Sequence, residues 1–244
     1  MPSVLLVFIY AMITALSTGL GAVPFFATRH IPRRILGWSG GLASGIMGAA
    51  SFNLIYEGLS YSATRTLLGI ILGLIFIYLS QTRLSNNDDV EVGALKGADA
   101  KKALLIVGVM TMHSFAEGVG VGVSFGGGET FGAFISIAIA VHNIPEGLAI
   151  SLVLVPKGVK PRNAMLWSIF SSLPQPLIAV PAFLFVWLFR PVLPVGLGLA
   201  AGAMIWMVMS ELIPDAIEDA PKEQVATVAT IAIALMVGFQ VLIG

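Results

Sequence analysis

The sequence has no cysteine and few charged side chains, and both shortages narrow the class of protein. Without cysteine there is no disulfide, no thiolate nucleophile and no cysteine-ligated metal site. Only 11% of the 244 residues are charged, whereas a soluble domain usually carries about 25%. The net charge is zero and no basic stripe could neutralise phosphates, which argues against a nucleic-acid partner. A hydrophobic content of 57% is typical of an all-α polytopic protein whose surroundings are the lipid bilayer.

The hydrophobic residues gather in long runs that predict eight transmembrane helices. Each run is close to the roughly 20 residues needed to cross the hydrocarbon core. The predicted spans are 3–27, 35–57, 66–82, 103–125, 131–155, 163–189, 193–213 and 224–243. The segment 83–102 is rich in charged and amide side chains and is predicted to be a solvated connector.

The basic residues indicate the orientation, because Lys and Arg concentrate in cytosolic loops. Eleven of the 13 lie in or beside the first, third, fifth and seventh connecting segments. The other two, Arg65 and Arg190, lie on the opposite side. This alternation predicts that both termini lie outside the cytosol, and the plasma (inner) membrane is the expected location.

Two segments of the first half recur in the second half at a constant offset. Residues 22–26 resemble 179–183, and residues 42–47 resemble 199–204, each 157 positions apart. Because the paired spans cross in opposite directions, the first three and the last three spans are predicted to be inverted repeats around the two central spans. Inverted repeats are typical of transporters with a binding site near the midplane. An ancient duplication that now serves only packing is the alternative.

The two central spans each carry the sequence H-x-x-x-E-G. Residues four apart share a helix face, so His113 with Glu117 and His142 with Glu146 each form a stripe along one span. All four lie near the middle of the membrane, where an ionised carboxylate costs about 2.5–3.5 kcal/mol or more. A bound cation or bound protons must therefore neutralise the charge of the two carboxylates.

A bound divalent cation would balance these carboxylates and accept neutral imidazole as a further ligand. This combination of ligands suits Zn²⁺ and also Fe²⁺, Mn²⁺ or Co²⁺. The alternative is a pair of protonated glutamates bonded to the histidines, as a proton relay or a buried structural network.

Further polar or soft side chains are expected near the same depth or at the ends of the spans. Met47 and Asn53 lie in the second span, although a methionine is more often core filler than ligand. Gln175 stands between two prolines, whose missing N–H groups leave backbone carbonyls unpaired. Glu57 and Glu211 lie near opposite membrane faces, where they either line the mouths of a path or simply mark where the helices leave the lipid.

Two other classes of protein are alternatives to a metal transporter. An intramembrane metalloprotease also needs buried His and Glu, but its H-E-x-x-H sequence is absent. A proton- or cation-coupled transporter of another solute would fit the repeats but would leave the doubled H-x-x-x-E-G unexplained. The sequence therefore favours a metal transporter over an enzyme.

These features resemble the ZIP (Zrt/Irt-like) family of divalent-metal transporters, and most closely its bacterial zinc transporter and GufA-like branch. The run 141–147, V-H-N-I-P-E-G, carries most of the resemblance, together with the second H-x-x-x-E-G and the eight spans. The resemblance implies a single ZIP-type transmembrane domain over 1–244, a 3+2+3 arrangement of helices and no cofactor. It also implies that Zn²⁺, or Fe²⁺, Mn²⁺, Co²⁺ or Cd²⁺, moves toward the cytosol as the substrate. A homodimer is one candidate for the oligomeric state.

The resemblance further implies metal ligands around two positions. The first position would be formed by Met47, His113, Glu117 and Glu146. The second would share the two glutamates and add Ser114, His142, Asn143 and Gln175. Asparagine is usual in the family where Ser114 stands, and an acidic residue is common where Gln175 stands. The second position is therefore expected to bind a metal ion more weakly.

Overall fold

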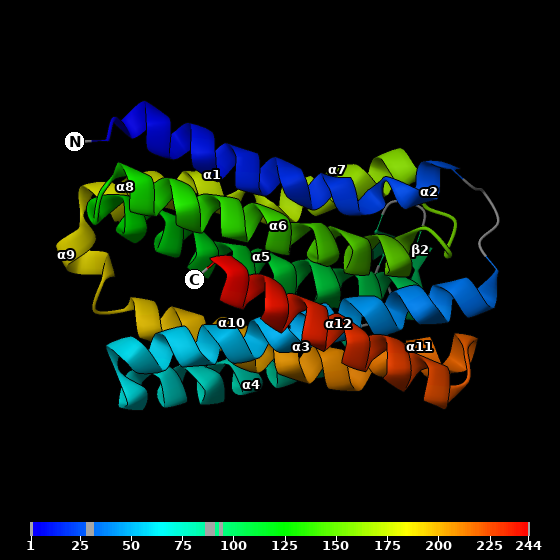
Figure 1. The fold of residues 1–244 in the computed structure, drawn as a ribbon. Helices are drawn as coiled ribbons and strands as arrows, with labels where there is room; N and C mark the ends of the chain where they lie inside the picture. Colours follow the sequence, from blue (N-terminus) through cyan, green and yellow to red (C-terminus); the bar gives the residue numbers. More distant parts are fainter. Residues whose placement is uncertain (1, 28–31, 86–90, 93–94, 244) are drawn as a thin grey trace.

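The protein is a bundle of helices that run side by side (Figure 1). The structure is a computed structural model, and the residues that it describes are 2–27, 32–85, 91–92 and 95–243. Apart from the antiparallel hairpin of β1 (Glu91–Val92) and β2 (Leu95–Lys96), the regular structure of these residues is helical. The all-α prediction is confirmed. Helices suit lipid because each segment pairs its own backbone N–H and C=O groups.

The helices follow one another along the chain with short breaks. The first part contains α1 (Val4–Thr18), the 3₁₀ turn η1 (Gly19–Ala22), α2 (Pro24–Ala27), α3 (Arg33–Tyr61) and α4 (Ala63–Ser85). The middle contains α5 (Gly97–Gly126) and α6 (Glu129–Leu154). The last part contains α7 (Pro161–Ser172), α8 (Pro174–Leu184), α9 (Val186–Phe189), α10 (Leu193–Met207), the π-helical segment η2 (Val208–Leu212), α11 (Ile213–Asp219) and α12 (Lys222–Ile243).

Each predicted span falls on helical backbone, but the boundaries differ most around the predicted connector 83–102. There α4 extends to Ser85, and α5 begins at Gly97, six residues before the predicted start. Residues 97–102 are therefore helical rather than part of a solvated loop, while 86–90 and 93–94 lie outside the described residues.

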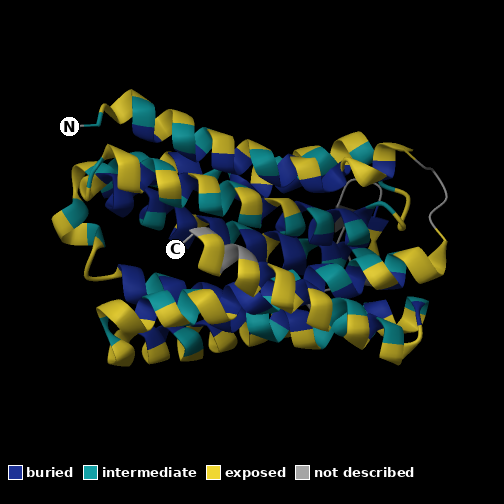
Figure 2. Cartoon of the chain, viewed as in Figure 1, coloured by how far each residue is buried: buried dark blue, intermediate teal, exposed yellow. Residues whose placement is uncertain are grey.

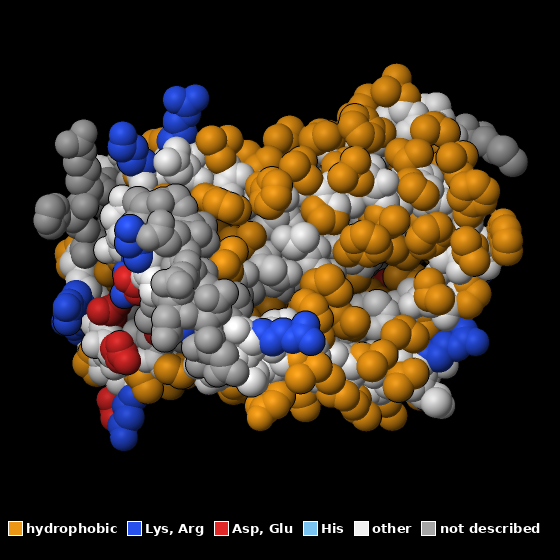
Figure 3. Space-filling view, turned by 180° about the vertical axis from the view of Figure 1, so that it is seen from behind, with side chains coloured by type: hydrophobic (Ala, Val, Ile, Leu, Met, Phe, Trp, Pro, Cys, Tyr) orange, Lys and Arg blue, Asp and Glu red, His pale blue; other side chains and the backbone are white. Residues whose placement is uncertain are grey.

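Six helical segments of the described residues are long and apolar enough to cross a membrane. They are Val4–Ala27, Ala63–Arg83, Asp99–Gly126, Glu129–Leu154, Pro161–Leu184 and Leu193–Asp219. Hydrophobic side chains cover much of the face seen in Figure 3, and most charged ones gather at the end that holds α11. Exposed apolar surface of this extent fits lipid, and a multi-pass membrane protein is confirmed. Because α3 and α12 are not among the six, eight spans remain a prediction.

The helices pack in two groups that do not follow chain order. The first group contains α1, α5, α6, α7 and α8, and the second contains α3, α4, α10, α11 and α12 (Figure 1). Buried residues concentrate where the helices face one another (Figure 2). Because α5 of the first group also packs against α10 of the second, the two helices with the H-x-x-x-E-G motifs lie near the middle of the molecule.

Positions related by the sequence repeat make equivalent contacts. A Cβ at Gly45 of α3 would collide with the Ala229 carbonyl of α12. Gly202 of α10 lies 157 positions later, and a Cβ there would collide with the Ile70 carbonyl of α4. Small residues at such positions let helix backbones approach closely in a membrane. The pair α3 and α12 is therefore packed in the same way as the pair α10 and α4.

Candidate metal site

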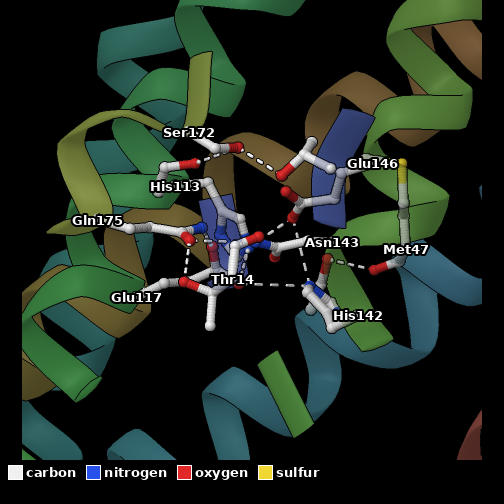
Figure 4. A network of polar contacts seen from close by, with 12 residues as sticks. Thr14, Met47, His113, Glu117, His142, Asn143, Glu146, Ser172 and Gln175 are labelled. Atoms are coloured by element: carbon white, nitrogen blue, oxygen red, sulfur yellow. Dashed lines mark hydrogen bonds and ion pairs between the residues drawn. The ribbon is translucent and has the colours of Figure 1, made fainter. Parts of the chain in front are cut away.

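Two histidines and two glutamates meet between α5 and α6 (Figure 4). Helix α5 contributes His113 and Glu117, and α6 contributes His142 and Glu146, so the two H-x-x-x-E-G stripes face each other. Each residue offers one ligand atom, and these four atoms lie within 4.8 Å of one another. The structure thus brings together the four residues that the spacing singled out.

His113 lies at the centre of this His–Glu cluster. Its Nε2 is 2.7 Å from Glu146 Oε1 and 3.3 Å from Glu117 Oε1. His142 lies at one edge, with its Nε2 3.3 Å from Glu146 Oε1 and 4.0 Å from Glu117 Oε1. The His142 side chain is 11% exposed, whereas the other three are at most 4% exposed. His142 is therefore the member most open to an arriving ion.

Several polar atoms of the cluster have no hydrogen-bond partner among the described residues. They are Nδ1 and Nε2 of His113, Nε2 of His142 and both carboxylate oxygens of Glu146. Buried polar groups are nearly always paired, and an unpaired buried charge is costly. The imidazole nitrogens lie against the carboxylate oxygens, so one cation could contact both kinds of ligand. A divalent ion would satisfy these atoms and balance the two carboxylates.

The glycine after each glutamate of the motif lets a further helix approach the cluster. A Cβ at Gly118 would collide with Ile178 of α8, and a Cβ at Gly147 would collide with the Thr18 carbonyl at the end of α1. Both close approaches depend on the missing side chain. They bring polar residues of α8 and α1 to the edge of the cluster.

Gln175 of α8 is hydrogen-bonded to Glu117. Its Nε2 donates to Glu117 Oε2 at 2.5 Å. Its Oε1 accepts from Asn143 Nδ2 at 3.1 Å and from the Thr14 hydroxyl at 2.5 Å. Asn143 Nδ2 also donates to the Thr14 carbonyl at 2.9 Å. An amide N–H thus stabilises Glu117 at the place where the resemblance implies a second metal ion.

Ser114 belongs to a chain of hydroxyl groups beside the cluster. Its Oγ donates to Ser172 Oγ of α7 at 3.4 Å, and Ser172 Oγ lies 2.7 Å from Thr18 Oγ1. Sequence reasoning missed Ser172, Thr18 and Thr14. The two threonines are fully buried and four positions apart in an apolar helix, and polar residues at that spacing were the signal that could have identified them.

Met47 is fully buried on α3, in an apolar cluster with Met110, Ile150 and Met204. A thioether fits such surroundings as core filler, because it is flexible and polarisable. Its assignment as a metal ligand stays a prediction.

A cavity of about 240 Å³ adjoins the His–Glu cluster. Its lining includes Glu117 and His142 from the cluster and Asn53 and Glu57 from the last turns of α3. Glu57, predicted near one mouth of the path, and Asn53, predicted as a gate or path residue of the same span, therefore share one cavity with two of the candidate ligands.

Glu211, the residue predicted at the inner mouth, takes part in an ion pair that the sequence did not indicate. Its Oε2 lies 3.1 Å from Lys102 Nζ, and Asp215 Oδ1 lies 2.6 Å from the same atom. Sequence reasoning missed Lys102 because it placed this residue in the solvated connector. The structure places it on α5, the helix of His113 and Glu117.

Comparison with known proteins decides the family. The family model of the ZIP zinc transporters matches residues 79–244, which include all four residues of the His–Glu cluster. The chain belongs to the ZIP zinc transporter family. Transport of a divalent metal, with zinc foremost, is therefore confirmed as the function of its family, and the prediction that the protein is not an enzyme is confirmed with it.

Three curated relatives agree with this family. A proposed zinc transporter of Arabidopsis thaliana is 51% identical over 240 residues, which cover 96% of this chain and 38% of that protein. The zinc transporter GufA of Myxococcus xanthus is 29% identical over 84% of this chain and 86% of its own length. The zinc transporter ZIPB of Bordetella bronchiseptica is 32% identical over 91% of this chain and 74% of its own length. This ZIP protein thus spans about two fifths of the Arabidopsis relative and most of the two bacterial ones.

Proposed function

We propose that this protein carries a divalent cation, with zinc as the first candidate, from the outer side of the plasma membrane toward the cytosol. The observation that supports this most is the His–Glu cluster, where two imidazoles and two carboxylates face one another with unpaired atoms. Zinc is the first candidate because nitrogen and carboxylate oxygen suit it and because the names of the relatives specify it.

The proposed path begins in the cavity lined by Glu57 and Asn53. A hydrated cation there meets Glu117 and His142, which line the same cavity. His113 and Glu146 then replace further water molecules, and the two carboxylates balance the charge of the ion while neutral imidazole supplies nitrogen ligands. The bound ion thereby offsets the free-energy cost of placing two ionised glutamates in the membrane.

A second, weaker metal position would share the two glutamates and would add His142 together with its neighbours Ser114, Asn143 and Gln175. In the structure Gln175 already donates to Glu117, and Asn143 already donates to Gln175 and to the Thr14 carbonyl. A second ion would have to break these bonds. Met47, from α3, is the proposed further ligand of the first position.

The proposed topology is one transmembrane domain over 1–244 with eight spans, including α3 and α12, and with both termini outside the cytosol. The equivalent packing of Gly45 and Gly202 supports inverted repeats formed by the first three and the last three spans, as the 3+2+3 arrangement requires. The uneven distribution of Lys and Arg supports the orientation.

Metal uptake by purified protein in lipid vesicles tests the proposed function. Zn²⁺ should accumulate in vesicles that contain the protein, and excess Fe²⁺, Mn²⁺, Co²⁺ or Cd²⁺ should compete according to its affinity for the cluster. Protein-free vesicles provide the background. If no divalent cation enters above this background, the proposal is wrong.

The topology predicts which side of the membrane reaches single cysteines placed in this cysteine-free chain. Lys160→Cys, exposed before α7, should react with an impermeant thiol reagent only from the cytosolic side. Glu129→Cys, exposed at the start of α6, should react only from outside. Labelling of both variants from one side would contradict the eight-span orientation.

A further inference from the structure

Lys102 links the two groups of helices at the end of the molecule away from the proposed outer cavity. It lies near the start of α5, in the first group, whereas its partners Glu211 and Asp215 lie in η2 and α11, in the second group. Its Nζ donates to Asp215 Oδ1 at 2.6 Å and lies 3.1 Å from Glu211 Oε2. The side chains of Lys102 and Glu211 are 23% and 15% exposed, so the pair is partly withdrawn from water.

The face of α5 that carries the metal ligands also carries Lys102. Going back along the helix from Glu117 and His113, this face continues through Met110 and Ile106 to Lys102, at steps of three or four residues. Met110 and Ile106 are at most 1% exposed. The ion pair and the His–Glu cluster therefore lie on one line, separated by about three turns of helix.

Met110 and Ile106 form one side of an apolar layer between the His–Glu cluster and the ion pair. The second group of helices supplies the other side of this layer. Met204 and Met207 of α10 are fully buried and belong to the same cluster of apolar residues as Ile106 and Met110. Glu211 follows Met207 by four positions, in a π-helical segment of the kind often found at functional sites. On one side of the His–Glu cluster the structure thus has a cavity, and on the other it has packed apolar side chains followed by an ion pair.

From this asymmetry we infer that Lys102, Glu211 and Asp215 form a cytosolic latch, a contact that must break before the metal ion leaves the His–Glu cluster. The inference rests on the proposed direction of transport. While the latch is closed, it holds α5 against η2 and α11. When the two groups separate, water reaches the three charged groups, and the lost ion pair is replaced by hydration. Lys102 is thus a positioning residue that favours the state open to the outside.

A single cysteine in the apolar layer measures how often the latch opens. The chain has no cysteine of its own, so Met207→Cys provides one defined probe. In vesicles of known orientation, an impermeant thiol reagent on the cytosolic side should label Met207→Cys slowly. Adding Lys102→Gln, which removes the charge and shortens the side chain by one atom, should raise this rate about tenfold, equivalent to about 1.4 kcal/mol. Asp215→Asn should raise it as well, whereas Lys102→Arg should keep it low.

A matched control is available at the same end of the molecule. Lys157 Nζ lies 3.0 Å from Asp99 Oδ1, but this exposed ion pair connects α5 to the turn after α6, within the first group. Lys157→Gln should leave the labelling rate unchanged. A second probe, Ala138→Cys in the cavity lining, should react from outside at a rate within about twofold of its original value when Lys102→Gln is added. A generally loosened protein would instead react faster at both probes.

Several outcomes would overturn the latch. They are an unchanged Met207→Cys rate in Lys102→Gln, an equal rise in Lys157→Gln, or a parallel rise at Ala138→Cys. If Lys102→Gln and Asp215→Asn both fail to fold while Lys102→Arg folds, the ion pair serves folding and the latch is wrong. Labelling of Met207→Cys only from the outer side would contradict the proposed direction of transport instead, which separates the two failures.

Discussion

Glu146→Gln is expected to reduce metal uptake to the level of protein-free vesicles. The Glu146 side chain is fully buried, and its Oε1 contacts Nε2 of both His113 and His142. Glutamine keeps the shape of the side chain but replaces a charged ligand with a weaker neutral one. Loss of a partner outside the metal's own ligands commonly costs about 10–100-fold in affinity, so loss of a shared carboxylate should cost at least that much.

Thermal unfolding shows whether this variant has lost its site or its fold. Without metal, the free energy of unfolding should stay the same or rise, because a buried carboxylate that accepts no hydrogen bond from the described residues is gone. The rise in Tm that Zn²⁺ produces in the unmodified protein by binding the folded state should disappear. Glu129→Gln provides a control on the same helix, since Glu129 is exposed in the first turn of α6. Normal uptake by Glu146→Gln would remove the cluster from the transport path.

The meeting of His113, Glu117, His142 and Glu146 follows from the sequence because two rules act together. Spacing by four places each His and Glu on one helix face, and burial in lipid leaves such side chains only the protein interior to face. The spacing does not predict which helices pack around these four residues. A hydrophobic run specifies that a helix is buried in lipid or protein but not which helix packs against it. Spacing alone therefore did not place Thr14 of α1 beside the cluster, and Gln175 of α8 was expected there only from the resemblance to the ZIP family.

The latch was missed for a different reason, which concerns the start of a helix. Residues 97–102 contain two lysines and an aspartate, and charged residues beside an apolar run predict the end of a span. In the structure this segment forms the first turns of α5, with Lys102 paired to two carboxylates that lie more than 100 positions later in the sequence. A long-range ion pair makes a charged helical turn acceptable at the edge of the membrane, and no local pattern indicates its partners.

Gln175→Glu is expected to raise the number of metal ions bound per protein from one toward two. In the unmodified protein the Gln175 amide donates to Glu117 Oε2, so a neutral N–H takes the place that a second cation would occupy. Glutamate at this position removes the donor and sets a second negative charge against Glu117. Two facing carboxylates in a buried site repel unless a cation lies between them, and Asn143 and Ser114 would be its neighbours.

Equilibrium binding of Zn²⁺ or Cd²⁺ to the purified protein and to Gln175→Glu measures this change directly. The variant should bind a second ion or bind the first one more tightly, and its turnover in vesicles should fall because a deeper electrostatic trap slows release. Gln175→Met separates the two effects of the substitution, since it also loses the hydrogen bond to Glu117 but adds no charge, and it should bind only one ion. Two ions bound with similar affinity by the unmodified protein would show that the Gln175 amide does not replace the second cation.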